Sequence, residues 1–371
     1  MKNTKYLINI CRLVPEEWQV TELENNLIRV SYSHKGSGLQ PKSFTLRKIL
    51  IFDDDFITGI AMYLGDGKLS RDLNHLDFCS IDKDMILFMI NFFERYFHLD
   101  RNTFSNSLYY RKETENMLND WSDYLNIYPL KINVYHSDRN NHESFSFQIG
   151  GKILRILSGK IVLQVLLLDF LQNENLRRAF LRGIFAAEGT IAINKKTNYI
   201  VYMEFFLHYD ENHLANKIQE ALRYEGIKYI LQKYPKRNCQ GIRLTHWSNY
   251  YKCWKIGLFD LNERKRQKFF EKMKKTRFSC RIIPQLKAKI LDTNLSQRQL
   301  AFKLGVTPSI ITHLKNRDMF VNIEYLIKIS TVIGISLSKI KQNITEFRVN
   351  DVTTIDDKEF IDFAFEVKSN C

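Results

Sequence analysis

The sequence contains no two cysteines separated by two residues, and its six cysteines stand singly at positions 11, 79, 239, 253, 280 and 371. This spacing suggests neither a zinc site nor a disulfide framework, so we expect free thiols in a reducing cytoplasm. Long apolar runs are also missing. The richest one, residues 161–171, includes Asp169 and is too short to cross a bilayer. The first residues lack the apolar stretch of a signal peptide, so we expect no membrane association.

Apolar and aromatic residues are plentiful. The chain has 371 residues, of which 44% are hydrophobic and 13% aromatic, enough for two or three domains with buried cores. Its formal net charge of +14 favours a polyanionic partner. Residues 346–371 run against this trend, because they carry seven acidic and three basic residues. The positive charge is therefore concentrated in the rest of the chain.

Two short strings carry most of the functional information: GIAMYLGDG at 59–67 and LRGIFAAEG at 181–189. Each is small and apolar and ends in one carboxylate followed by a glycine. The carboxylate is Asp66 in the first string and Glu188 in the second. A glycine at this point suits a helix end, where a left-handed backbone conformation is needed.

Small residues recur four positions apart in both strings, at Ala61 and Gly65 and again at Gly183 and Ala187. On a helix this spacing makes a bare stripe that lets two backbones approach closely. Two such helices, packed stripe to stripe, would bring the two carboxylates together at one end. A pair of carboxylates in that position predicts a magnesium site.

The two strings resemble the signature of the LAGLIDADG homing endonucleases, and two copies in one chain resemble the single-chain form of that family. The resemblance covers roughly residues 50–278. It implies a monomeric, intracellular, site-specific endonuclease that hydrolyses double-stranded DNA at a long pseudo-palindromic target. In such an enzyme Asp66 and Glu188 are the catalytic carboxylates, and they hold Mg²⁺ together with Gly65 and Ala187. The same resemblance implies cleavage across the minor groove.

The family also adds one basic residue in each half, close to its last helical segment. The resembling segments are residues 158–160 and 263–266, so Lys160 and Lys265 are the candidates. Two positions depart from the commoner wording of the signature. Ala61 replaces a glycine, which keeps the position small, and the second acid is a glutamate, which also binds metal.

The flanks of both strings predict an α+β fold with the order helix, two strands, helix, two strands, helix occurring twice. We expect the first repeat at 46–175 and the second at 176–280. Asp82 is expected to cap a helix that runs to residue 97. Two such repeats form a pseudo-symmetric saddle, and its strands would face the DNA major groove. The expected contact residues are Lys68, Arg71, Asn74, Tyr110 and Lys112 in the first repeat, and Gln232, Tyr234, Lys236, Arg237, Asn238, Arg243 and Thr245 in the second.

Residues 285–345 predict a separate all-α bundle that resembles the repressor-type helix-turn-helix family. Ser296 would cap the second helix, Gly305 would form the turn, and Thr307 would cap the recognition helix. The residues that could reach bases or phosphates are Gln297, Thr307, Ser309, Thr312, His313 and Lys315.

Two other functions stay open at this point. One is a DNA-binding transcriptional regulator that has lost cleavage, and the other is an intron RNA maturase on the same scaffold. The first segment, residues 1–45, shows short strand-like runs without an assigned role. Residues 346–371 are expected to form an acidic tail.

Overall fold

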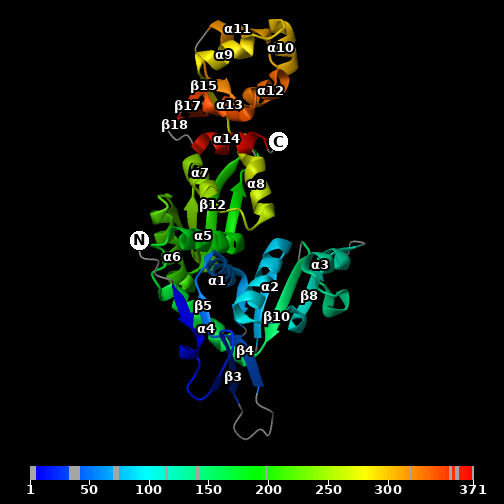
Figure 1. The fold of residues 1–371 in the computed structure, drawn as a ribbon, viewed down its shortest axis with the longest axis vertical. Coiled ribbons are helices and arrows are strands. Elements are labelled where there is room, and N and C mark those ends of the chain that lie inside the picture. The colour runs from blue at the N-terminus through cyan, green and yellow to red at the C-terminus, as the bar shows by residue number, and fades with distance from the viewer. Residues whose placement is uncertain are drawn as a thin grey trace. The chain divides into compact units, whose positions relative to one another are not determined.

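The computed structural model describes residues 6–32, 42–69, 75–112, 116–138, 142–196, 199–316, 319–350, 353–355 and 359–369 (Figure 1). The chain forms two compact units, one made of residues 1–190 and 202–266, the other of residues 191–201 and 267–371. Within the described ranges, no helix is both long and apolar enough to cross a membrane. The five cysteines of those ranges are free thiols.

The N-terminal segment is a small β module. Strands β2 (Gln19–Leu23), β3 (Leu27–Tyr32) and β4 (Lys42–Arg47) form an antiparallel meander. Asn25 and Asn26 take positive φ angles of 58° and 61° in the first turn, a conformation that asparagine tolerates. Strand β1 (Leu7–Asn9), followed by the short helix η1 (Ile10–Arg12), pairs with β5 (Ile49–Ile51) directly before the first motif helix.

The first repeat follows the expected order, with one addition. Its elements are α1 (Asp54–Asp66), β6 (Gly67–Leu69), β7 (His75–Ser80), α2 (Lys83–Phe97), η2 (Arg101–Thr103), β8 (Ser105–Tyr110), α3 (Met117–Leu125), η3 (Pro129–Lys131), β9 (Ile132–His136), β10 (Ser144–Gly150) and α4 (Lys152–Leu167). The sheet order is β6-β7-β10-β8-β9. The sequence predicts a helix between β8 and β10 but not strand β9. Strand β9 pairs with β8 in parallel.

Helix α4 differs from the expectation in length and burial. The sequence predicts a short helix at 152–157 and a buried element at 161–171. The structure joins most of both into one helix that ends at Leu167. Leu163 and Leu167 are 57% and 73% exposed, because only one side of the helix packs on the core. The apolar run is therefore buried on one side only, through Ile161, Val165, Phe170 and Leu171.

The second repeat has the same order of elements. They are α5 (Glu174–Glu188), β11 (Gly189–Ile193), β12 (Ile200–His208), η4 (Tyr209–Glu211), α6 (Asn212–Tyr224), β13 (Ile230–Tyr234), η5 (Pro235–Arg237), β14 (Cys239–Leu244), α7 (Trp247–Lys255) and α8 (Glu263–Met273). The sheet order is β11-β12-β14-β13. Helix α7 was not expected. The fold is α+β, as predicted.

The C-terminal unit contains the helices expected for residues 285–345, together with a small sheet whose strands lie mostly outside that range. Helices α9 (Pro284–Leu291), α10 (Gln297–Leu304), α11 (Pro308–Asn316), α12 (Ile323–Ile333) and α13 (Leu337–Gln342) are accompanied by strands β15 (Phe278–Ile282), β16 (Val321–Asn322), β17 (Ile344–Val349) and β18 (Thr353–Ile355). The sheet order is β16-β15-β17-β18. The expected cap and turn are confirmed: the Ser296 hydroxyl accepts from the main-chain N–H of Gln299, and Gly305 has φ 67°.

Residues 346–371 do not behave as an acidic tail. They supply most of β17, β18 and helix α14 (Glu359–Ser369). The side chains of Phe360, Phe363 and Val367 are fully buried, and the rings of Phe360 and Phe363 pack on Phe278. The net charge of this segment concealed an apolar helix face at helical spacing.

Candidate functional site

The two motif helices pack against each other along their small residues, as the sequence predicts. Figure 1 shows α1 beside α5. A Cβ atom at Gly65 would lie 2.5 Å from the Cβ of Ala187. A Cβ at Gly183 would overlap the main-chain oxygen of Thr58 and lie 2.8 Å from the Cβ of Ala61. Glycine is therefore required at both positions for this close helix contact.

The glycines that follow the two acids are not left-handed, which corrects one expectation. Gly67 has φ −78° and Gly189 has φ −72°, both with extended ψ angles. They are required for a different reason. A Cβ at Gly67 would overlap the carbonyl and ring of Tyr63, and one at Gly189 would overlap those of Phe185. At both glycines the chain passes directly from a helix into a strand, in contact with the ring of Tyr63 or of Phe185.

Asp66 and Glu188 are the last residues of α1 and α5. A Cβ at Gly65, next to Asp66, would lie 3.0 Å from the Cγ of Glu188, so the two helix ends meet. Burial in the first place, and then the negative charge of Asp66, raise the pKa of Glu188 to about 8. The two carboxylates therefore lie within each other's electrostatic field, in a partly buried position.

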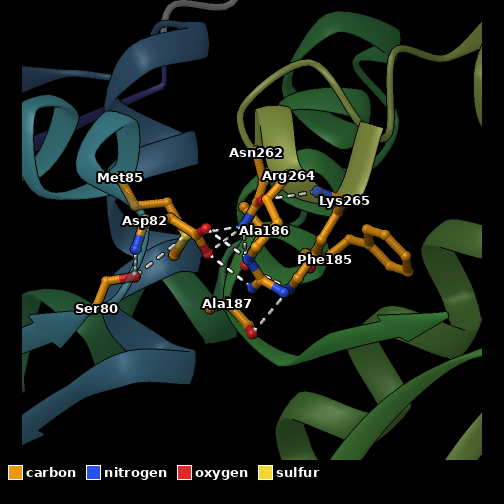
Figure 2. A network of polar contacts seen from close by, with 9 residues as sticks. All are labelled: Ser80, Asp82, Met85, Phe185, Ala186, Ala187, Asn262, Arg264 and Lys265. Carbon is orange, nitrogen blue, oxygen red and sulfur yellow. Dashed lines mark hydrogen bonds and ion pairs between the residues drawn. The ribbon is translucent and has the colours of Figure 1, made fainter. Parts of the chain in front are cut away.

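Lys265 closes the end of the second motif helix. Its side chain is buried, and its ammonium group donates to the main-chain oxygens of Phe185 at 2.9 Å, Ala186 at 2.6 Å and Ala187 at 3.2 Å (Figure 2). Burial lowers the pKa of Lys265 to about 8, although the charges of nearby acids, Asp66 first, oppose the shift. A cation is thus placed at the negative end of the helix that carries Glu188.

Asp82 does not cap its own helix, contrary to the expectation. Its carboxylate accepts two hydrogen bonds from Arg264, at 2.8 and 2.9 Å, and one from Asn262 at 2.8 Å (Figure 2). Burial alone would raise the pKa of Asp82, but these hydrogen bonds lower it overall. Asn262 also accepts from the main-chain N–H of Lys265 at 3.0 Å. This network joins the first repeat to the start of α8.

The structure does not bring Lys160 to the acids. Its ammonium group donates to the main-chain oxygen of Leu13 at 2.7 Å. Arg155, another basic residue of this helix, lies close to Tyr63 of the first motif helix. Burial and the charge of Asp77 raise the pKa of Tyr63, and the charge of Arg155 opposes this rise. The Nε of Arg155 is buried and has no hydrogen-bond partner within the described ranges. Of the two expected basic residues, only Lys265 lies beside the carboxylates.

The donor set fits a hard divalent cation held largely by water and substrate. Asp66 and Glu188 offer carboxylate oxygens, the ligands that Mg²⁺ and Ca²⁺ prefer. Among the described residues, no group of three or more histidine, cysteine, aspartate or glutamate side chains could hold a metal ion. The main-chain oxygen of the expected ligand Ala187 accepts a hydrogen bond from Lys265 at 3.2 Å. A metal ion bound to this oxygen would therefore compete with the ammonium group. Two carboxylates leave several coordination positions open.

A cavity of about 810 Å³ lies on the sheet of the first repeat, next to Asp66 and Lys265. Strands β7 and β10 alternate between buried residues such as Phe78 and Phe147 and residues that line this cavity. The polar lining residues that sequence reasoning missed are Asp77, Tyr109, Ser144, Ser146 and Gln148. Alternation of apolar and polar residues in 75–80 and 144–150 would have identified all of them except Tyr109, which lies on β8.

Only some of the expected contact residues of the first repeat lie among the described residues. Arg71, Asn74 and the side chain of Lys68 lie outside the described residues. Tyr110 shares the strand face of the buried Leu108 rather than that of the cavity, and its ring contacts His136. The neighbouring Tyr109 lines the cavity, and a DNA contact of Tyr110 stays a prediction. Lys112 is exposed and lines a second cavity of about 430 Å³ with Lys83 and Arg111.

The second repeat brings several expected residues to one face. Gln232 and Tyr234 on β13 alternate onto the same side as Arg243 on β14, and Thr245 follows in step. Lys236, Arg237 and Asn238 are exposed in the intervening turn. Sequence reasoning missed Glu204, which is 3% exposed and accepts hydrogen bonds at 2.8 Å from both Arg243 and Tyr234. Gly241 leaves the space that this side chain occupies.

In the C-terminal unit the expected contact residues lie on the outer side of α10 and α11. Gln297, Thr307, Ser309, His313 and Lys315 are exposed and Thr312 is half-buried. Ile311 and Leu314 of the same helix are buried and face the core. The Thr312 hydroxyl donates to Gln297 at 3.5 Å, which ties the two helices together on this side. One side of α11 therefore packs on the core and the other is exposed.

Two segments of the chain match models of known protein families. Residues 175–252 match the family model of the LAGLIDADG-like domain, and residues 286–340 match that of the helix-turn-helix domain. These two segments are thus similar to a LAGLIDADG-like domain and to a helix-turn-helix domain, and each match covers less than half of the chain. No curated protein matches it.

Three solved structures show a distant likeness. The homing endonuclease I-DmoI in complex with DNA and Ca is 10% identical, over 55% of this chain and 91% of that chain, with a TM-score of 0.30. The meganuclease I-SmaMI bound to uncleavable DNA is 10% identical over 76% and 96%, with a TM-score of 0.31. DUF199/WhiA from Thermotoga maritima is 11% identical over 76% and 92%, with a TM-score of 0.32.

Proposed function

We propose that this protein is a site-specific endonuclease that hydrolyses phosphodiester bonds of double-stranded DNA with a divalent cation, Mg²⁺ in the cell. One observation carries the proposal: the helix ends that bear Asp66 and Glu188 meet, and the two carboxylates perturb each other. A partly buried pair of like charges at two helix C-termini is unfavourable without a cation. The LAGLIDADG-like domain that contains Glu188 supports this function.

In this proposal Asp66 and Glu188 hold the cation through their carboxylate oxygens, with the main chain at Gly65 and Ala187 at the edge of the site. The bound cation would activate water and neutralise charge on the phosphate. Lys265 fixes the last turn of α5 and thereby orients Glu188, and its positive charge offsets that of the acids. Arg155 replaces Lys160 as our candidate for the basic residue of the first repeat.

DNA would lie on the polar faces of the two sheets. Both repeats belong to one chain, so we expect a monomer that reads a long, imperfectly palindromic site. The net charge of +14 supports attraction to the phosphate backbone. The helix-turn-helix domain would add affinity or reach flanking sequence, and all of this takes place inside the cell where the DNA is.

The decisive experiment incubates the purified protein with a library of randomised duplexes and Mg²⁺ and sequences the cut ends. Asp66→Asn and Glu188→Gln should each abolish cutting and leave duplex binding largely intact, because they remove cation ligands but keep the shape of the site. Asp55→Asn is the matched control, since Asp55 is exposed and pairs with Arg95. Normal nicking by either motif variant would overturn the assignment.

The helix-turn-helix domain favours a second candidate, a DNA-binding regulator without cleavage. The same library separates the two. Enrichment of a bound sequence without cut ends at any divalent cation would establish the regulator. An intron RNA maturase would instead promote splicing of its intron in vitro.

A further inference from the structure

The two repeats differ at one equivalent position, the connection between the third and fourth strands of their common pattern. In the second repeat, β13 and β14 are joined by the tight turn at residues 235–238. In the first repeat, β8 and β10 are joined by residues 111–143, which contain α3 and β9. A parallel strand such as β9 needs a long crossover connection, and α3 is part of it.

The inserted strand is a packed part of the sheet. Trp121 on α3 is 1% exposed and stacks on Phe145 of β10, with ring centroids 5.2 Å apart. Its indole N–H donates to Glu143 at 3.2 Å. At the start of β9, Ile132 is also buried. The sheet of the first repeat is therefore one strand wider than that of the second, and the extra strand is held in place.

Strand β9 adds to the face that carries the candidate site. Tyr135 is in register with Tyr109 of β8, and the two rings stack with centroids 5.5 Å apart. Tyr109 lines the 810 Å³ cavity, as does Ser137, which follows β9 with the parity of Tyr135. That cavity is also lined by Asp66. The face is thus continuous from the motif carboxylate to the inserted strand.

We propose that β9 extends the DNA-reading surface of the first repeat, so that Asn133 and Tyr135 contact base edges at the outer end of one half-site. This inference rests on the proposed DNA binding of the two sheets. Asn133 is exposed, and Tyr135 is 48% exposed. An asparagine amide can pair with adenine in the major groove, and a tyrosine offers a hydroxyl and an apolar ring edge.

The lining of the second cavity has three basic residues against one acidic residue, Glu143, and this excess fits the phosphate backbone of a nucleic acid. The 430 Å³ cavity at the end of β8 is lined by Lys83, Arg111 and Lys112 and shares Ile81 and His142 with the larger cavity. Cations at the rim position a duplex through its phosphates, while the uncharged Asn133 and Tyr135 are suited to bases.

The width of the extra strand determines how many further base pairs it can cover. Neighbouring strands lie about 4.8 Å apart, and DNA rises about 3.4 Å for each base pair. One added strand therefore covers about one to two further base pairs. Only the first repeat has it, so the target is asymmetric, with a longer half-site on that side.

The test compares sequence preferences from the randomised duplex library for the full-length protein and four variants. Asn133→Ala and Tyr135→Ala should abolish the preference at one or two outer positions of one half-site only, and weaken binding of the selected duplex about five-fold or more. Tyr135→Phe keeps the ring stack and should retain most of the apolar contact. Val134→Thr, on the opposite face of the same strand, is the matched control and should leave the profile unchanged.

The outcomes separate this inference from the proposed function. If the unmodified protein selects a site and both alanine variants select the same site with the same preference throughout, the inference about β9 is wrong and DNA binding stands. Equal loss at both ends of the site would also overturn it. If the unmodified protein selects no sequence at all, the proposed function itself fails. Asn133→Ala keeps the test valid if Tyr135→Ala does not fold, because Asn133 is exposed.

Discussion

The ammonium group of Lys265 lies 2.6 Å from the main-chain oxygen of Ala186, two residues before the acid at the end of the second motif helix. Helix C-termini leave their last carbonyl groups without partners and carry partial negative charge. Lys265 donates to three carbonyl groups of this helix end, of which that of Phe185 also accepts from the main-chain N–H of Gly189. One side chain therefore fixes the helix end that positions Glu188 and supplies a positive charge beside it.

We expect Lys265→Met to abolish most of the cleavage activity and to lower stability. The variant keeps the length of the side chain but removes three hydrogen bonds to main-chain carbonyl groups, that of Ala187 among them, at a cost of about 1–3 kcal/mol. Cleavage of the selected duplex should fall by at least about 100-fold, because Glu188 is no longer held and the charge beside it is lost. Single-turnover cleavage and urea unfolding measure the two effects.

Lys160→Met is the control for that experiment. Lys160 is exposed and donates to Leu13, away from the motif helices. Its replacement should leave the cleavage rate unchanged and should alter the free energy of unfolding by no more than about 0.5 kcal/mol. Similar losses in both variants would show that Lys265 has no special position at the site.

The carboxylate of Asp82 predicts a pH-dependent contribution to stability. Its pKa is lowered in the folded state because the hydrogen bonds from Arg264 and Asn262 outweigh its burial. The unfolded chain therefore binds the proton more readily, so the contribution is present above the usual pKa of aspartate and is lost as the pH falls. Asp82→Asn should lower the free energy of unfolding by about 1–2 kcal/mol at neutral pH.

The difference between the native protein and Asp82→Asn should shrink as the pH is lowered below about 4. Urea unfolding at several pH values measures it. Asp55→Asn provides a comparison, since the Asp55–Arg95 pair is more than half exposed and should matter little at any pH. A constant difference across the pH range would contradict the role assigned to Asp82.

The close contact of the motif helices predicts that two glycine substitutions affect stability differently. Gly183→Ala puts a Cβ against the main-chain oxygen of Thr58, where neither backbone can give way without separating the helices. We expect a loss of about 1–3 kcal/mol and reduced cleavage. At Gly150 a Cβ meets nothing within 4 Å. Gly150→Ala should therefore leave thermal stability nearly unchanged, and a similar loss in both variants would contradict the argument.

What the sequence predicted well was local and periodic. The small-residue stripes identified both motif helices and their mutual packing, because spacing of three and four residues describes a helix face directly. The Ser296 cap and the Gly305 turn followed from local chemistry in the same way.

What the sequence did not predict depends on contacts between distant residues. Asp82 has the position of a cap, but Arg264 and Asn262, far along the chain, take its carboxylate. Strand β9 pairs with β8 in parallel, a contact between segments that are distant in the sequence and that the local pattern does not reveal. The acidic character of residues 346–371 hid the aromatic face of α14, since net charge says nothing about which side of a helix is apolar.

The raised pKa of Glu188 predicts that metal binding releases a proton. In the metal-free protein this carboxyl group has a pKa of about 8, because of its burial and then the charge of Asp66. Below that pH it is largely protonated, whereas a divalent cation needs the carboxylate. Apparent affinity for Mg²⁺ should therefore rise roughly tenfold per pH unit up to about pH 8 and then level off. Without metal, stability should decline as the pH rises from the usual pKa of glutamate towards 8.

Isothermal titration of Mg²⁺ into the DNA-free protein, in two buffers with different ionisation enthalpies, measures the released proton directly. The observed heats should differ by close to one buffer ionisation at neutral pH, and Glu188→Gln should remove the difference and weaken binding. Asp66→Asn should weaken binding as well, and in addition lower the pKa of Glu188, because it removes the neighbouring charge while burial remains. Equal heats in both buffers for the native protein would show that Glu188 is already ionised. The charge of Asp66 would then not raise the pKa of Glu188, which would contradict the close approach of the two acids.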